Sequence, residues 1–397
     1  MGFRASSLVL ALGLGGCLGA GEFADRAVEH NRAIAQASEE ITLLNIVRAK
    51  YDRPIVYSQF GGVSEAFTNS VGIGTSIPFG PDAGKAYNAD IAASPEQFVS
   101  LSTAPLDDQD FYQGVMRPVQ VGLMRYYVDN GWPRDLVVAL AVEKLQIGAG
   151  FYARVVAESD AACAARPASL ACPRIADPSR VHAVPQASGG QIVFHNDPRR
   201  AELFDPFHEL VLRLIVLGLT IDTVNVPHEV RLPASAQIAV DADQIAKMTA
   251  ASTSVRREGG DVVVTTYGWQ PALRLAALGQ TRVRVEGQGG GPAEVDMTAS
   301  LRSPDSILFY LGAYARDGGA DASILIDTPG HERWVSVFEI AGCDDAVVSV
   351  DFDGACYGIP RGGDHVSMKV IGFLQQVIAL NKRAVEPPTT GVVKTVN

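Results

Sequence analysis

Apolar residues recur at helical spacing in five stretches of the chain. Within residues 25–50 and 107–130 they follow one another at steps of three and four, which places them on one face of a helix. The stretches 206–218, 303–314 and 366–381 repeat this spacing. We predict a helix with one buried face in each of them.

Residues at the ends of two of these stretches carry the signals that start or stop a helix. Asp107 or Asp108 can cap the second helix, and Gly131-Trp132-Pro133 ends it. Ser303 is a good N-cap, and the proline and aspartate that follow it suit the first turn of a helix. The predicted inner face of the second helix consists of Phe111, Val115, Val119, Leu123 and Tyr126.

Alternation of apolar and polar residues predicts strands, most of them in the C-terminal half. The predicted strands there are 261–265, 281–286, 334–340, 346–350 and 356–359. Asp353-Gly354 lies between the last two and is typical of a hairpin turn. Residues 55–93 place short apolar segments between Gly and Pro, which predicts further strands or an extended glycine-rich segment. Residues 134–148 are nearly all apolar and are expected to be buried as helix or strand.

Together these patterns indicate an α+β fold, in which amphipathic helices pack on antiparallel strands and hairpins in one large or two small domains. Residues 158–190 are rich in Ala, Pro and Ser, and we expect a long surface loop or a linker there. This segment separates an N-terminal α+β part, residues 29–157, from a C-terminal α+β part, residues 191–385. Residues 386–397 are expected to form a flexible tail.

Composition excludes several classes of protein. With 47% hydrophobic and 19% charged residues, the 397-residue chain can bury a core and is not intrinsically disordered. Its formal net charge of −11 argues against binding to nucleic acid, and against adsorption to anionic lipid through its own side chains.

The N-terminal segment has the features of a signal peptide. Arg4 supplies a positive start, and the apolar run of residues 8–14 is shorter than the ~20 residues that span a bilayer. The run ends in Leu14-Gly15-Gly16-Cys17, which resembles the lipobox of bacterial lipoprotein precursors. The alternative is a buried N-terminal helix that happens to end in Gly-Gly-Cys.

The lipobox resemblance implies cleavage after residue 16 and attachment of lipid to Cys17. Residues 1–16 are then the signal peptide, and residues 17–28 are the lipidated cysteine and its tether. Two or more acyl chains hold a protein on a membrane almost permanently. Leu18 stands where an aspartate tends to retain lipoproteins of this kind in the inner membrane, so the resemblance implies an outer-membrane protein, on the periplasmic face or at the cell surface.

Lipidation of Cys17 would leave four of the five cysteines for pairing in an oxidising compartment. Four cysteines allow three connectivities. We favour local bridges, Cys163 with Cys172 and Cys343 with Cys356, because each pair is close in sequence. Free buried thiols are the alternative. Neither pair has the Cys-x-x-Cys spacing of a redox or zinc site.

Three separate segments resemble a family of secreted bacterial lipoproteins of uncharacterised mechanism. They are residues 39–49 with 53–57, then Ser102-Thr103-Ala104-Pro105-Leu106 before Phe111 with Gly131-Trp132 after the next helix, and residues 372–381. The resemblance implies a tethered α+β protein and supplies no active site.

Motifs that could carry chemistry are incomplete. His208-Glu209, His228-Glu229 and His331-Glu332 lack the second histidine that a zinc site on a helix requires. Ser64 lacks the second glycine of a nucleophile elbow, so we assign it to a loop. Gly72-Ile73-Gly74 lacks the third glycine of a dinucleotide-binding turn.

An acidic segment remains as a possible ion site. Asp351-Phe352-Asp353-Gly354, with Asp344-Asp345 nearby, could collect oxygen ligands for calcium. We favour a solvated hairpin turn instead, because the spaced ligands and the closing glutamate of a calcium loop are missing.

The sequence therefore predicts no catalytic residue, metal ligand or cofactor. Our leading hypothesis is a non-enzymatic outer-membrane lipoprotein that acts as a structural or assembly component of the envelope. It would contact the membrane through its lipid anchor and an envelope protein as partner. A tethered module that binds a small molecule or glycan is the alternative, and an envelope hydrolase is a third hypothesis.

Overall fold

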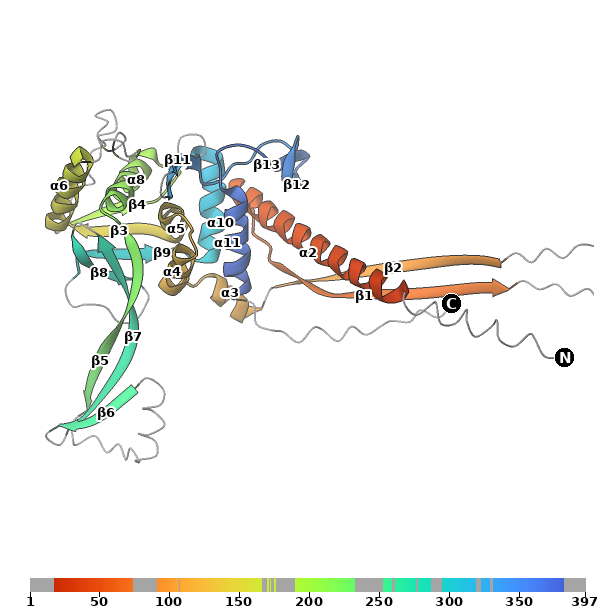
Figure 1. Ribbon diagram of the computed structural model, residues 1–397, viewed down its shortest axis with the longest axis horizontal. Coiled ribbons are helices and arrows are strands. Elements are labelled where there is room, and N and C mark those ends of the chain that lie inside the picture. The colour runs from red at the N-terminus through yellow and green to blue at the C-terminus, as the bar shows by residue number, and fades with distance from the viewer. Residues whose placement is uncertain are drawn as a thin grey trace, which may run out of the picture. The chain divides into compact units, whose positions relative to one another are not determined.

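The computed structural model describes residues 18–73, 91–106, 108–165, 170, 172, 175, 190–232, 253–258, 261–275, 278–286, 295–318, 323–328 and 331–381. The predicted signal peptide, Cys17 and the predicted tail at residues 386–397 lie outside the described residues. The elements that are described confirm the α+β class (Figure 1). No helix among them is both long enough and apolar enough to cross a bilayer.

The described chain falls into two compact units, and each is considered by itself. Unit 1 comprises residues 18–38 and the described residues from 56 to 111, and unit 2 comprises residues 39–55 and the described residues from 112 to 381. Helix α2 (Leu18–Lys50) contributes residues to both. This grouping differs from the predicted division at residues 158–190.

The predicted division does not hold because strands from its two sides belong to one sheet. Strand β3 (Val142–Gly148) pairs with β4 (Gln191–His195), which follows the supposed linker, and also with β9 (Met297–Leu301). Pairing on both edges satisfies the backbone of β3 and buries Leu145 and Ile147.

Unit 1 contains one long hairpin. Strands β1 (Ser58–Ile73) and β2 (Ile91–Pro105) are antiparallel, with Ser58 opposite Pro105 and an irregularity between Phe60 and Val63. At the base of the hairpin, the Tyr57 and Phe111 rings meet edge to face at 5.2 Å between centroids. Ser64, predicted in a loop, lies within β1 opposite Ser100, because the surrounding residues pair as a regular ladder.

The seven-stranded sheet of unit 2 has the order β4-β3-β9-β8-β7-β5, with β6 pairing on β7. Its further strands are β5 (Thr220–Leu232), β6 (Thr253–Glu258), β7 (Asp261–Leu275) and β8 (Gly279–Val285). All pairs are antiparallel except β8 with β9. Figure 1 shows β5 and β7 continuing as a ribbon beyond β3, β4, β8 and β9, with β6 at its far end.

Helices pack around the sheet and supply much of the core. They are α4 (Val121–Asp129), α5 (Arg134–Ala141), α6 (Ala149–Ala165), α8 (Ala201–Val216), α10 (Pro304–Ala313) and α11 (Ser367–Ala379). Helix α8 packs on β4 and α6, while α10 packs on α5 and α11. Leu136 and Leu140 of α5 and Phe207 of α8 are fully buried, so α5 lies at the centre of the packed helices. This confirms that the apolar segment 134–148 is largely buried.

Two small antiparallel sheets complete unit 2. One pairs β10 (Ser323–Thr328) with β11 (His331–Ser336), and the other pairs β12 (Ala346–Phe352) with β13 (Ala355–Pro360). Asp353 and Gly354 join β12 to β13 with φ of 50° and 79°, which confirms the predicted hairpin turn.

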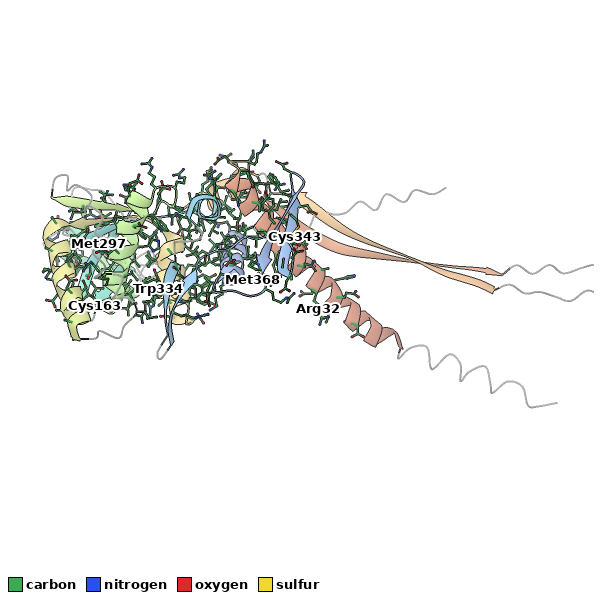
Figure 2. The ribbon with its side chains drawn as sticks, turned by 90° about the horizontal axis from the view of Figure 1, so that it is seen from above. Arg32, Cys163, Met297, Trp334, Cys343 and Met368 are labelled. Carbon is green, nitrogen blue, oxygen red and sulfur yellow. A yellow bond between two sulfur atoms is a disulfide. The ribbon has the colours of Figure 1, made fainter. Side chains whose placement is uncertain are left out.

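Both predicted disulfides are present. The Cα atoms are 5.4 Å apart for Cys163 and Cys172, and 5.7 Å apart for Cys343 and Cys356. The first bridge ties the end of α6 to the segment that follows, and the second closes the β12–β13 hairpin. Cys163 and Cys343 lie far apart along the long axis of the view in Figure 2, so each bridge stabilises a separate part of unit 2.

The predicted single helix from residue 107 to 130 is wrong. Two helices stand in its place, α3 (Gln109–Val115) and α4, because Pro118 has no N–H group and disfavours helical geometry at the residue before it. Asp108 caps α3 as predicted, accepting from Phe111 N at 2.8 Å. The break also changes which face of the second helix is buried. Val121, Met124 and Tyr127 are buried, whereas Leu123 is half-buried and Tyr126 is exposed.

Two predicted loops contain helix instead. Residues 18–28, predicted as a tether, form the first turns of α2, because alanines at positions 20, 24 and 27 favour helix more than Gly19 and Gly21 oppose it. Residues 158–165, predicted to open a long loop, form the last turns of α6. There Arg213 of α8 binds Asp160 at 2.8 Å and Ser159 Oγ at 2.7 Å, which holds the end of α6 in place.

Close packing of α10 against the end of α2 gives a test of the fold within unit 2. A Cβ atom on Gly312 would lie 2.6 Å from backbone atoms of Ala49 and Lys50. We predict that Gly312→Ala lowers the free energy of unfolding by about 1–3 kcal/mol, since neither helix can move away without opening the core. Urea titration followed by circular dichroism measures this change.

Gly372→Ala is the matched control, because Gly372 also lies inside a helix and a Cβ there meets nothing within 4 Å. It should raise the free energy of unfolding by roughly 0.5–1 kcal/mol through the better helix propensity of alanine. Equal effects of the two substitutions would contradict the close approach of α10 and α2.

Candidate functional site

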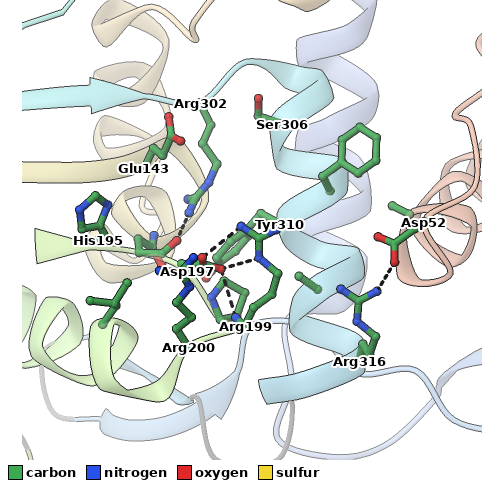
Figure 3. Close-up of a pocket in the computed structure, with 16 residues that line it drawn as sticks. Asp52, Glu143, His195, Asp197, Arg199, Arg200, Arg302, Ser306, Tyr310 and Arg316 are labelled. Carbon is green, nitrogen blue, oxygen red and sulfur yellow. Dashed lines mark hydrogen bonds and ion pairs between the residues drawn. The ribbon is translucent and has the colours of Figure 1, made fainter.

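Unit 2 contains a polar cavity of about 460 Å³ (Figure 3). This volume is within the range of roughly 300–1,000 Å³ that is usual for small-molecule sites. Four parts of the chain form its wall: the end of α2, the start of β3, the segment from β4 into α8, and α10 with the turn after it. The lining residues are Ala49, Asp52, Glu143, His195, Asn196, Asp197, Pro198, Arg199, Arg200, Leu203, Arg302, Ser306, Phe309, Tyr310, Ala313 and Arg316.

One wall of the cavity is built where α5 passes directly into β3. Val142, the C-cap residue of α5, already has extended backbone angles of −96° and 123°, so no turn separates the helix from the strand. The last carbonyl groups of a helix have no partner within the helix. Here they are buried, because residues 139–142 are almost inaccessible to solvent. The junction therefore needs hydrogen-bond donors from elsewhere in the chain.

Arg302 and Asn196 supply those donors. Arg302 Nη1 donates to the carbonyls of Ala139 at 3.0 Å and Val142 at 2.7 Å, and its backbone N–H donates to Ala141 O at 2.7 Å. Asn196 Nδ2 donates to the same Ala139 and Val142 carbonyls, both at 2.8 Å. Arg302 Nη2 also bonds to Asn196 O, which joins the two side chains into one network. The end of α5 is thus capped internally by a cation, the charge that the helix dipole favours there.

The guanidinium of Arg302 is buried, at 4% exposure for the residue, and no carboxylate forms an ion pair with it among the described residues. Burial lowers its pKa to about 10, which leaves it charged at neutral pH. Its Cζ atom lies 3.9 Å from the centre of the Tyr310 ring, so a cation–π contact adds to the carbonyl bonds. Arg302 is therefore a fixed positive charge in the cavity wall.

Two ion pairs lie among the residues that line the cavity. Arg199 forms a two-pronged contact with Asp197, at 2.8 Å from Nε and 3.0 Å from Nη2. Burial alone would raise the pKa of Asp197, but the hydrogen bonds and charge of Arg199, with the charge of Arg200, outweigh it and lower that pKa. The second pair is Arg316 with Asp52, at 2.9 Å.

Arg316 lies in a π-helical turn, Tyr314–Gly318, directly after α10. Turns of this kind are rare and frequently occur at functional sites. Figure 3 shows Arg316 paired with Asp52 at the right of the view and Arg199 paired with Asp197 nearer its middle.

Arg200 differs from the other three arginines of the cavity. It is exposed and forms no ion pair or side-chain hydrogen bond with any described residue. It is also the N-cap residue of α8, and no side chain caps this helix end. Arg200 is thus a positive charge whose hydrogen-bonding groups are available.

Two buried polar atoms in the wall have no hydrogen-bond partner among the described residues. They are the hydroxyl of Tyr310 and Oδ1 of Asn196, in residues that are 5% and 2% exposed. Burial raises the pKa of Tyr310, so its hydroxyl keeps its proton and can donate. Buried polar atoms without partners are uncommon in folded proteins.

Further polar side chains line the cavity. His195 and Glu143 are exposed, and Asp197 is already bound to Arg199. Ser306 Oγ accepts from Ser303 Oγ at 3.0 Å. No group of described residues could hold a metal ion. What the cavity offers is a set of cations and hydrogen-bonding groups.

Residues singled out from the sequence lie elsewhere. Cys17 lies outside the described residues, and the four other predicted site residues, Cys163, Cys172, Cys343 and Cys356, form disulfides away from the cavity. His208 lies among the aromatic rings of α8, 4.2 Å from that of Phe204. His228 is in β5 and His331 in β11. The acidic segment 351–354 forms the β12–β13 hairpin.

Sequence reasoning missed the residues that form the cavity. The available signals were Asp197-Pro198-Arg199-Arg200, immediately before a helix, and Arg302, immediately after an apolar strand. Both place cations at element ends, where side chains converge.

A second void, of about 60 Å³, is lined only by apolar side chains of the sheet and its helices, including Met124 and Met297. It is part of the core.

Comparison of the chain with protein-family models, curated proteins and solved structures finds no match. The polar cavity is therefore interpreted from its own residues.

The capping role of Arg302 is testable by substitution. We predict that Arg302→Met lowers the free energy of unfolding by about 3 kcal/mol, since it leaves buried carbonyls without donors. Arg302→Lys should recover only part of this loss, because an ammonium group cannot reach the same carbonyls as a planar fork. Urea unfolding measures both.

Arg333→Gln is the matched control, because Arg333 is an exposed arginine in an ion pair with Asp364 at 3.4 Å. Its effect should stay within about 0.5 kcal/mol. Similar losses for Arg302→Met and Arg333→Gln would show that the cap does not hold the junction.

Proposed function

We propose that this chain is a lipid-anchored protein of the bacterial outer membrane whose body binds a small molecule. The polar cavity of unit 2 is the observation that supports the proposal. It favours the binding module over the structural role that led the hypotheses drawn from the sequence. The proposed activity is recognition without chemistry, because the cavity combines cations and hydrogen-bonding groups with no assembled catalytic set.

Two features support a binding role for the cavity. Its volume suits a small ligand, and its wall is fixed by the Arg302 and Asn196 network. A fixed wall matters because side chains that are already ordered lose little entropy when a ligand binds. Phe309, which is 43% exposed and lines the cavity, adds an apolar surface for the ligand.

The anchor part of the proposal rests on residues 14–17 alone. Leu14-Gly15-Gly16-Cys17 matches the lipobox, and α2 begins at Leu18, the next residue. The lipidated residue would therefore directly precede a helix of 33 residues.

The proposed binding role predicts that the protein still carries its ligand when it is released from isolated envelopes. Native mass spectrometry of protein released mildly from envelopes should show an adduct of constant mass. Ser306→Trp should abolish this adduct, because Ser306 is exposed at the cavity and an indole there fills the space. Ser349→Trp, on an exposed strand position outside the cavity, should keep it.

An adduct that survives in Ser306→Trp, or protein from native envelopes that is wholly free of adducts, would contradict binding at the cavity.

The same spectra test a second candidate, a structural component that assembles through protein contacts. That role is favoured by the β1–β2 hairpin, which pairs with no third strand among the described residues. Unpaired edges of this length bind other strands readily. Masses at multiples of the chain, or of the chain plus a partner, would support it.

The anchor predicts that Cys17→Ser moves the protein from the membrane to the soluble fraction and removes the acyl mass from its N-terminus. The reason is that two or more acyl chains supply the membrane affinity, at about 0.8 kcal/mol for each buried methylene. Fractionation followed by intact-mass measurement checks this.

Cys343→Ser is the control for loss of a cysteine, because it removes one disulfide and leaves the lipobox intact. It should stay in the membrane fraction. Membrane retention of Cys17→Ser equal to that of the natural protein would refute the anchor.

A further inference from the structure

Charged groups of both signs line the cavity, and most of them already have partners in the protein. Arg199 is bound to Asp197, and Arg316 is bound to Asp52. Arg302 donates to buried carbonyl groups. These side chains shape the wall. A charged ligand gains most from the lining groups whose charges are still unmatched, because it breaks no existing ion pair there.

Two unmatched charges of opposite sign remain among the arginine, aspartate and glutamate residues of the lining. Arg200 and Glu143 are both exposed at the cavity. The side chain of neither forms an ion pair or a hydrogen bond with any described residue, so they do not pair with each other. A ligand that satisfies both must carry a negative and a positive charge.

The backbone holds Glu143 and Arg200 within reach of one small ligand. Asn196 N donates to Glu143 O at 2.8 Å, and Arg200 N donates to Asp197 O at 3.2 Å, which closes a turn. The usual Cα spacings across paired strands, along the chain and across such a turn place the Cα atoms of Glu143 and Arg200 at most about 16 Å apart. Their long side chains border the same cavity, and a peptide spans up to about 3.5 Å for each residue.

Apolar side chains line the same cavity. Phe309 of α10 is exposed there, and Leu203 of α8 is half-buried. An apolar group of the ligand that covers them leaves water, which contributes roughly 25 cal/mol for each Å² of apolar surface buried. The lining therefore suits a ligand that has an apolar group as well as two opposite charges.

We propose that the cavity binds a small zwitterion of the amino-acid and short-peptide class, with its carboxylate at Arg200 and its ammonium group at Glu143. This inference rests on the proposed binding function and names the chemistry of its ligand. A guanidinium group donates two parallel hydrogen bonds to a carboxylate, and an ammonium group donates to the carboxylate of a glutamate. A free amino acid and a short peptide share this chemistry and differ in the distance between their charges.

Isothermal titration calorimetry on the full-length protein tests the inference with two zwitterions, leucine and alanyl-leucine. Each is compared with its own N-acetylated form, which lacks the ammonium group, and with its own amide, which lacks the carboxylate. We expect at least one zwitterion to bind at least tenfold more tightly than both of its blocked forms. The tighter of the two zwitterions distinguishes an amino-acid site from a peptide site.

Two variants locate the charges. Arg200→Gln should weaken the zwitterion about tenfold and leave the affinity for its amide unchanged, because the amide has no carboxylate for Arg200 to bind. Glu143→Gln should weaken the zwitterion by about the same factor and leave the affinity for its N-acetylated form unchanged. A general disturbance of the cavity would instead weaken all forms of the probe in both variants.

Arg361→Gln and Glu158→Gln are the matched controls. Arg361 is an exposed arginine in an ion pair with Asp345, and Glu158 is an exposed glutamate of α6. Neither lines the cavity, so both variants should bind the zwitterion as the natural protein does.

A blocked form that binds as tightly as its zwitterion, or full affinity in Arg200→Gln and Glu143→Gln, would overturn the inference. Its failure is distinguishable from failure of the proposed function. If envelope-derived protein carries an adduct that Ser306→Trp removes but neither zwitterion binds, the cavity is a binding site for another class of ligand. If no adduct is present and no probe binds, both proposals fail.

Discussion

A single buried cation fixes the geometry on which the cavity depends. The direct passage from α5 to β3 leaves carbonyl groups in the interior, and the guanidinium of Arg302, the residue after β9, donates to them. Arg302 lies between β9 and Ser303, the N-cap residue of α10. It therefore connects the end of α5 with both β9 and α10. Other elements of unit 2 are then positioned relative to this junction.

The division of labour among the arginines follows from that constraint. Arg302 is directed inward to carbonyls, Arg199 and Arg316 are held by carboxylates, and Arg200 keeps its donors for solvent or ligand. Charges that are already neutralised shape the wall and its potential. Arg200, whose side chain forms no ion pair or hydrogen bond with any described residue, can contribute affinity, since a ligand there gains an ion pair without breaking an existing one. Structure and recognition are thus carried by different members of one cluster.

Local signals predicted the elements well where a short-range interaction decides the structure. The caps at Asp108 and Ser303, the turn at Asp353-Gly354 and both disulfides depend on neighbours in sequence, and all are present. The single helix predicted across Pro118 was wrong, because the periodic apolar pattern was given more weight than the N–H group that proline lacks. The cavity could not be assembled from the sequence, because Asn196 and Arg302 are separated by 106 positions and meet only through the order of strands in the sheet.

The most direct test of the account is where an oxyanion binds in a crystal of the protein. Selenate is suitable, because selenium gives an anomalous signal that marks its position without ambiguity. The account predicts a peak in the cavity within hydrogen-bond distance of Arg200, with Arg302 still bound to the carbonyls of Ala139 and Val142. Selenate at other surface sites with none in the cavity, or an Arg302 side chain released from those carbonyls, would contradict it.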